Sequence, residues 1–240
     1  MKSSMYLYGK NSVSERINAN PKSIKQIFLT ANFASPHIIE LMGASNIPSK
    51  RVTEKEFQKI KRADRAQGII AEVTRFNYTP YDELLNNEKY TDFTIIFLDN
   101  ISDPHNLGSI IRTTACLGKF AVVLPRHSSC EVNDTVMHVA SGGENFTPVS
   151  VVNNTSTALI KAKKSGRWIV GTAAKGGESI EEADLPFPLC VVLGSEGKGI
   201  RPGVRKQLDM NLTLPMKGAK LSFNVAISCA MICYEISRRK

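Results

Sequence analysis

Three short segments of the sequence place polar side chains next to glycine or a turn, each shortly after an apolar run that predicts a buried strand. The segments are DPHNLGSIIRTT at 103–114, LGSEGKG at 193–199 and LPMKGAKLSFN at 214–224. Their amide, hydroxyl and carboxylate groups can orient a polar substrate, and the guanidinium of the first segment can stabilise a developing negative charge. These segments are therefore the candidate site, and the rest of the chain must bring them together.

The first segment predicts a helix that begins near the turn at Asp103 and Pro104. Asn106 falls at the N-terminus of this helix, either as its cap or as a group that binds a ligand. Arg112 is predicted to point away from the apolar face of the helix, so it is either an ordinary solvated arginine or an exposed functional group. The residues on that apolar face are Leu107, Ile110, Ile111, Thr114 and Leu117.

The second segment contains three glycines close together after an apolar strand. Glycine lets the backbone approach a flat or anionic ligand closely, because no side chain intervenes. The spacing is neither the GxGxxG fingerprint of dinucleotide sites nor a P-loop, which ends in Gly-Lys-Ser or Gly-Lys-Thr. Glu196 is then either a site carboxylate or a simple loop residue.

The third segment follows a short predicted strand at 212–214 and leads into an apolar helix at 224–238. Ser222 or Asn224 can cap this helix, and capping alone would explain why a polar residue stands there. The alternative is that these side chains belong to a functional site. The helix carries apolar residues on more than one stripe. It therefore needs cover on two sides, either from the chain's own core or from a second copy.

The chain has 240 residues and a net charge of +9, which favours an acidic partner such as nucleic acid, although many mildly basic proteins have none. Residues 1–73 contain 12 Lys and Arg against 6 Asp and Glu, and so account for +6 of this charge. A small region with most of the positive charge is typical of a domain that binds a polyanion.

The five cysteines include no CxxC pair, which favours free thiols in a reducing cytoplasm. The four histidines lack a zinc-binding spacing, so we expect no metal. No apolar run approaches the roughly 20 residues of a membrane span, and the N-terminus has no signal-peptide pattern. We therefore expect a cytoplasmic protein with no membrane partner.

The first part of the chain, 1–73, predicts a small α/β domain. Strands are predicted at 26–30 and 68–73, and they alternate with helices. One helix opens with a capping box, in which Thr53 is the cap and Glu56 is the third helical residue.

Residues 74–92 are polar, with one short helical stretch, and are predicted to link this domain to a second one at 93–240. In the second domain the unbroken apolar run FTIIFLD is followed by the stretches AVVLP, TPVSVV, RWIVGT and LCVVLG, which are separated by helical stretches. Such runs are typical of parallel strands covered on both faces, so we predict an α/β fold with a doubly wound parallel sheet.

Together the three segments resemble the motifs of the SpoU (TrmH-type) group of SPOUT RNA ribose 2′-O-methyltransferases. In that group an Asn precedes Arg-Thr by six residues, a strand leads into G-x-E-G-x-G, and [IL]-P-M-x-G-x-x-x-S-[LF]-N-V follows. NLGSIIRTT, LGSEGKGI and LPMKGAKLSFNV match these motifs in order. Residues 1–73 also resemble the L30e-like RNA-binding domain of this group, with YLYGKNSVSERI as its opening helix and RAQGIIAEV as its closing strand. The nearest subgroup is the RlmB-like enzymes, which methylate a guanosine of 23S rRNA.

The resemblance implies that the end of the chain forms a C-terminal trefoil knot, whose backbone binds S-adenosyl-L-methionine, and that the last helix packs against a second subunit in a homodimer. It also implies RNA, and most directly 23S rRNA, as the substrate. The catalytic residues carried over to this chain are Arg112, Asn106, Glu196, Ser222 and Asn224. The cofactor-binding residues carried over are Thr172, Leu193, Gly194, Leu214, Met216 and Phe223, the last standing where Leu is usual.

Two other functions also fit the sequence. One is a tRNA 2′-O-methyltransferase of the same family; the N-terminal position of the extra domain and the short end after the last helix favour rRNA instead. The other is a ribosome-assembly protein that binds RNA without catalysis. A binding protein would not need Arg112, Glu196 and Asn224, so the enzyme is the leading hypothesis.

Overall fold

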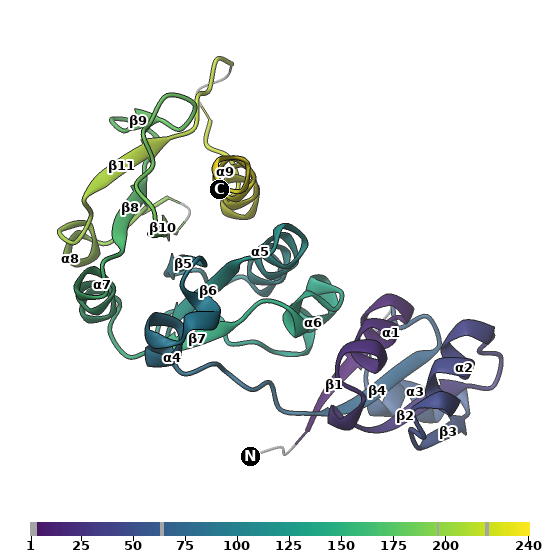
Figure 1. Cartoon of the computed structure of the whole chain (residues 1–240). Helices are drawn as coiled ribbons and strands as arrows, with labels where there is room; N and C mark the ends of the chain where they lie inside the picture. Colours follow the sequence, from purple (N-terminus) through teal and green to yellow (C-terminus); the bar gives the residue numbers. More distant parts are fainter. Residues whose placement is uncertain (1–3, 63–64, 196, 219–220) are drawn as a thin grey trace.

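The structure is a computed structural model that describes residues 4–62, 65–195, 197–218 and 221–240. Within these residues the strands form two separate sheets, one of four strands and one of seven. Figure 1 shows the small sheet with its helices at one end of the molecule and the large sheet with its helices at the other, joined by an extended segment.

The small sheet has the order β1-β4-β2-β3, in which β4 is antiparallel to both of its neighbours and β2 is parallel to β3. The helix α3 packs on one face, with Phe57 in the same core as Ile70, whereas α1 and α2 cover the other face. The strands are β1 (Ser4–Tyr8), β2 (Ile24–Thr30), β3 (Ser49–Val52) and β4 (Ile69–Thr74), and the helices are α1 (Lys10–Ala19), α2 (Pro36–Ala44) and α3 (Glu54–Ile60).

The predicted capping box at the start of α3 is confirmed. The Thr53 side chain accepts a hydrogen bond from the Glu56 amide (3.4 Å), and the Glu56 carboxylate accepts one from the Thr53 amide (2.9 Å). That second bond lowers the pKa of Glu56. The assignment of YLY to the opening helix is wrong, because these residues belong to β1, which pairs with β4, and α1 begins only at Lys10.

The large sheet has the order β7-β6-β5-β10-β8-β11-β9, and every pair of neighbours is parallel. Every residue of β5 and β6 is buried, as their unbroken apolar runs predict for strands covered on both faces. The predicted parallel α/β sheet is therefore confirmed. The strands are β5 (Thr94–Asp99), β6 (Phe120–Pro125), β7 (Val149–Val152), β8 (Trp168–Thr172), β9 (Glu178–Ser179), β10 (Leu189–Gly194) and β11 (Met210–Thr213).

Helices cover both faces of the large sheet (Figure 1). On one face α5, α6 and α9 share a core with Ile96 and Leu98 of β5, and on the other α4, α7 and α8 share a core with Ile95 and Phe97. Successive residues of a strand thus face opposite helix layers. The helices are α4 (Tyr81–Asn86), α5 (Pro104–Leu117), α6 (Asp134–Ala140), α7 (Thr155–Lys164), α8 (Pro202–Arg205) and α9 (Val225–Arg239).

β5 and β10 lie side by side near the middle of the sheet, and their last residues, Asp99 and Gly194, are register partners. The chain continues from β5 to β6 and β7 on one side, while β8, β11 and β9 lie beyond β10 on the other. Where the strand order reverses in this way, open α/β sheets bind ligands at the carboxyl ends of the strands. The second polar segment begins at this point, and the first begins four residues after the end of β5.

The described helices include none that is long and apolar enough to cross a membrane.

Candidate active site

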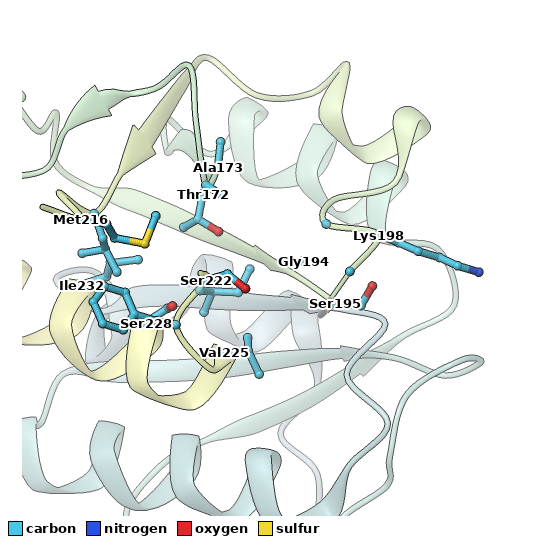
Figure 2. A pocket seen from close by; sticks show the side chains of 16 residues that line it. Thr172, Ala173, Gly194, Ser195, Lys198, Met216, Ser222, Val225, Ser228 and Ile232 are labelled. Atoms are coloured by element: carbon cyan, nitrogen blue, oxygen red, sulfur yellow. The ribbon is translucent and has the colours of Figure 1, made fainter. Parts of the chain in front are cut away.

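A cavity of about 360 Å³ lies at the carboxyl ends of β8 and β10 (Figure 2). Three separate parts of the chain line it: the ends of these strands with the loop after β10, the segment after β11, and the first turns of α9. Its size is within the range of small-molecule sites. The lining includes all six residues predicted to contact a cofactor: Thr172, Leu193, Gly194, Leu214, Met216 and Phe223.

The wall of the cavity is largely apolar, with hydroxyl groups at a few positions. Leu193, Val225 and Ile232 contribute aliphatic surface, and Thr172 and Ser228 contribute hydroxyls. The Thr172 hydroxyl donates a hydrogen bond to the carbonyl oxygen of Val192 (3.2 Å), which fixes its orientation. This lining suits a flat ring that has polar edges.

The loop after β10 folds back against Gly194. A Cβ at this position would lie 2.2 Å from the carbonyl carbon of Gly199 and 2.3 Å from the amide nitrogen of Ile200. Only glycine permits such an approach. The sequence predicted that a backbone would come close to a ligand here; in the structure, the closest approach to Gly194 is made by the loop's own backbone.

Asp99 anchors the far end of the same loop. Its carboxylate is fully buried and accepts hydrogen bonds from the backbone amide (2.9 Å) and from Nε (2.8 Å) of Arg201. Charge-assisted hydrogen bonds of this kind are among the strongest in proteins. Because Asp99 pairs in register with Gly194, one point of the sheet edge holds both ends of the loop.

Asn224 connects the third segment to the first. Its Nδ2 donates a hydrogen bond to Oδ1 of Asn106 (3.0 Å), although the two residues are 118 positions apart. Its Oδ1 accepts a hydrogen bond from the amide of Ala226 (2.8 Å), so Asn224 is the N-cap of α9. From the sequence, either Ser222 or Asn224 could have been this cap. In the structure Asn224 is the cap and Ser222 lines the cavity.

Asn106 is not a helix cap, so that interpretation of the sequence is wrong. The cap of α5 is Asp103, whose Oδ1 accepts a hydrogen bond from the amide of His105 (2.8 Å). Pro104 occupies the first helical position, which proline favours because its missing N–H is not needed there. Asn106 therefore lies within the first turn of α5, where its side chain meets Asn224.

Arg112 is exposed on α5, opposite the buried face, as its position in the helix predicts. Leu107, Ile110, Ile111 and Thr114 are buried on that face, and Leu117 is half-buried. Arg112 is not among the described residues that line the cavity. The structure thus joins Asn106 to Asn224 and brings Ser222 to the cavity, but it leaves Arg112 on the adjoining surface.

Glu196, the remaining predicted site residue, lies outside the described residues. Sequence reasoning missed Asp99, Lys198 and Ser228. Ser228 follows Asn224 by four positions and therefore lies on the same side of α9, a spacing that was visible in the sequence. Lys198 is among the residues that line the cavity, while Figure 2 shows its side chain extending away.

The Cys130 thiol lies near the first segment. Burial raises the pKa of Cys130, and the nearby charges of Asp103 and Glu131 raise it further. A thiol with a raised pKa stays protonated near neutral pH and reacts weakly. Among the described residues, no group of three His, Cys, Asp or Glu side chains is placed to hold a metal ion.

The sequence profile of the SpoU rRNA Methylase family matches residues 93–234. A second profile, described as RNA 2'-O ribose methyltransferase substrate binding, matches residues 6–79. The 23S rRNA (guanosine-2'-O-)-methyltransferase RlmB of Nitrosomonas europaea is 33% identical over 244 residues, which cover 100% of this chain and 93% of that protein. The protein of the same name from Pseudomonas aeruginosa is 32% identical, over 98% of this chain and 96% of its own length.

A solved structure shares the whole fold. The SpoU methyltransferase AviRb from Streptomyces viridochromogenes, in complex with AdoMet, superposes with a TM-score of 0.80 at 19% identity, over 99% of this chain and 90% of its own. The profile match across the large sheet and the full-length relatives agree with the three motifs. The chain belongs to the SpoU rRNA methylase family.

Proposed function

We propose that the protein is an S-adenosyl-L-methionine-dependent RNA ribose 2′-O-methyltransferase that acts on a guanosine of 23S rRNA. The observation that carries this proposal is the cavity, which gathers all six predicted cofactor residues beside the Asn106–Asn224 contact. The relatives named RlmB match this chain over nearly its full length, which favours 23S rRNA over tRNA.

The residues of the cavity suit S-adenosyl-L-methionine. Leu193, Leu214 and Ile232 offer apolar surface to the adenine ring, and Thr172 and Ser228 offer hydroxyls to its polar edge and to the ribose. The cofactor supplies a methyl group on a sulfonium, which is already a good leaving group. The proposed transfer therefore needs no metal ion.

The protein must position a weakly acidic hydroxyl and assist the loss of its proton. The 2′-oxygen has to lie about 3 Å from the methyl carbon, in line with the bond that breaks. We assign Asn106, Ser222 and Asn224, together with Glu196, to orienting the ribose. This assignment is supported by the contact of Asn106 with Asn224 and by the place of Ser222 in the cavity.

Arg112 is the proposed source of transition-state stabilisation. A guanidinium keeps its proton at any ordinary pH, so it does not act as the base. Its planar fork can instead hold an RNA phosphate or the developing oxyanion by charge-assisted hydrogen bonds. The exposure of Arg112 on α5 leaves it accessible to a large substrate.

We further propose a division of labour along the chain. Residues 1–73 form an L30e-like domain that binds the RNA substrate, residues 74–92 link it, and residues 93–240 form the methyltransferase domain. The excess positive charge of residues 1–73 and the separate sheets on either side of the linker support this division. We expect the reaction to take place in the cytoplasm, with the ribosomal RNA.

A trefoil knot at the end of the chain is also part of the proposal. The segment after β11 and the loop after β10 both line the cavity, together with the first turns of α9, which supports this part of the proposal. Knots are nearly absent from protein folds, so a knot at this position would need a functional reason. Here it would form the cofactor pocket.

The modified nucleotide can be found by mass-spectrometric mapping of 2′-O-methyl groups in rRNA and tRNA from cells with and without the gene. We expect one 2′-O-methylguanosine to disappear from 23S rRNA. Loss from tRNA alone would favour the tRNA enzyme, and unchanged methylation of both RNAs would favour the non-catalytic assembly protein.

Cofactor binding should depend on Gly194. We predict that Gly194→Val weakens binding of S-adenosyl-L-methionine at least about tenfold, because the new side chain would displace the backbone of Gly199 and Ile200. Isothermal titration calorimetry measures this directly. Gly43→Ala on α2 is the control, since a Cβ there would meet nothing within 4 Å and Gly43 does not line the cavity. Equal affinity of the Gly194→Val protein would contradict the pocket assignment.

The protein should be a homodimer that associates through α9. Ile227, Met231 and Tyr234 form a stripe on the side of α9 opposite its buried residues, with Ile227 53% and Tyr234 59% exposed. A second copy can cover such a stripe with its own in a two-fold contact. We predict twice the 26.4 kDa chain mass by light scattering at micromolar concentration, and a monomer for Ile227→Glu. Ile160→Glu on α7, where Ile160 is 41% exposed, should remain dimeric.

Arg112 gives the sharpest test of the mechanism. Because its side chain is exposed, Arg112→Ala should change the free energy of unfolding by no more than about 0.5 kcal/mol. Its single-turnover methylation rate should fall about 100-fold or more, as when one oxyanion donor is lost. Arg112→Lys should restore little activity, because an ammonium lacks the planar fork.

Lys164→Ala is the control, because Lys164 is an exposed cation on α7. Near wild-type turnover of a folded, cofactor-binding Arg112→Ala protein would refute the assignment.

A further inference from the structure

The small sheet and its helices pack against α6 and residues 142–144 of the second part of the chain. Tyr8 of β1 stacks on the ring of His138 in α6, with the ring centroids 4.1 Å apart. The Tyr6 amide donates a hydrogen bond to Asp134 (3.1 Å), and Lys61 forms an ion pair with the same carboxylate (2.6 Å). Buried apolar residues of both parts also belong to one continuous core. These contacts define a specific interface.

A buried ion pair lies in this interface. The Arg16 guanidinium, on α1, is 2.9 Å from the carboxylate of Glu144, and their side chains are only 7% and 0% exposed. Arg16 also donates to Ser23 Oγ (3.3 Å) and contacts the sulfur of Met137 (3.8 Å). The partners are 128 positions apart and come from opposite sides of the interface.

The chemistry of this pair favours a geometric role over a stabilising one. Nε of Arg16 and Oε2 of Glu144 have no hydrogen-bond partner among the described residues. A buried pair with such unsatisfied atoms recovers its desolvation cost poorly, and apolar residues of similar size can stabilise a protein as well or better. What a charged pair adds is directionality, since only one relative placement of the two groups is favourable.

The residues around Glu144 connect the interface to α5. A Cβ at Gly142 would lie 2.4 Å from the Cβ of Glu15 on α1, so this glycine allows α1 to approach closely. A Cβ at Gly143 would lie 3.0 Å from the Cα of Arg112. Three consecutive residues, 142–144, thus touch the N-terminal part on one side and the turn of α5 that carries Arg112 on the other.

We propose that Arg16 and Glu144 are positioning residues that fix the RNA-binding part of the chain at one distance and orientation from Arg112 and the cavity. This inference rests on the proposed function, in which RNA held by the N-terminal part must present one ribose to the cofactor. A misplacement of about 1 Å at a reacting centre can reduce a rate about 100-fold. A rigid connection between the two binding surfaces therefore matters for turnover.

The test separates positioning from stability by replacing both charges at once. Arg16→Met combined with Glu144→Leu fills the same space with apolar side chains, so we expect the thermal midpoint and the affinity for S-adenosyl-L-methionine to stay at wild-type values. With 23S rRNA transcribed in vitro as substrate, we expect kcat to fall about 10-fold to 100-fold while KM for RNA changes little. Small-angle X-ray scattering should show a broader range of distances between the two parts.

Glu144→Gln keeps the shape of the side chain and removes only its charge, and should give the same loss of kcat if it folds. The control is the exposed pair Lys161–Asp82, which joins α7 to α4 away from the interface. Lys161→Met with Asp82→Asn should leave kcat, KM and scattering unchanged.

A folded double variant with wild-type kcat would overturn the proposal. If the wild-type chain methylates no RNA, the proposed function has failed, and the scattering measurement still decides on the fixed arrangement. In that case, identical scattering curves for the wild type and the double variant would overturn the positioning role.

Discussion

The parallel pairing of β5 with β10 is the constraint on which the site depends. It sets Asp99 beside Gly194, so that one buried carboxylate holds the far end of the loop whose near end packs on that glycine. α5 starts five residues after β5, and this short connection brings Asn106 to Asn224. A slip of one residue between the strands would turn Asp99 to the opposite face of the sheet and release the loop.

Local signals in the sequence were sufficient for the central strands of the large sheet, whereas the short strand β9 was not predicted. The unbroken apolar runs of β5 and β6 predicted buried parallel strands, and the spacing of apolar residues in α5 predicted the exposure of Arg112. The cap of α5 could also have been predicted, because Pro104 at the first helical position makes the preceding Asp103 the cap. Asn106 has the same capping chemistry, and residue type alone did not distinguish the two.

Contacts between distant parts of the chain could not be predicted in this way. Asp99 has no unusual neighbours in the sequence, and its role depends on Arg201, which is 102 positions away. Gly194 was expected to make room for a ligand. In the structure, however, the atom nearest to a Cβ at this position would belong to the backbone of Gly199. In both cases the residue that each of these side chains or backbones contacts is determined by the order of the strands in the sheet. Local sequence patterns do not encode that order.

α9 shows how one element can serve the core and the site together. Cys229, Cys233 and Ile236 fix it against the sheet, which leaves its N-terminus at the cavity. There Asn224 uses Oδ1 to cap the helix and Nδ2 to bond Asn106, so the cap determines which way the amide group faces. Serine or aspartate would cap α9 equally well. An aspartate, however, cannot donate, so it would keep the contact only if the Asn106 amide turned its Nδ2 toward the carboxylate. The amide of Asn224 accepts from the helix and donates to Asn106 at once, so this asparagine serves the site as well as the helix.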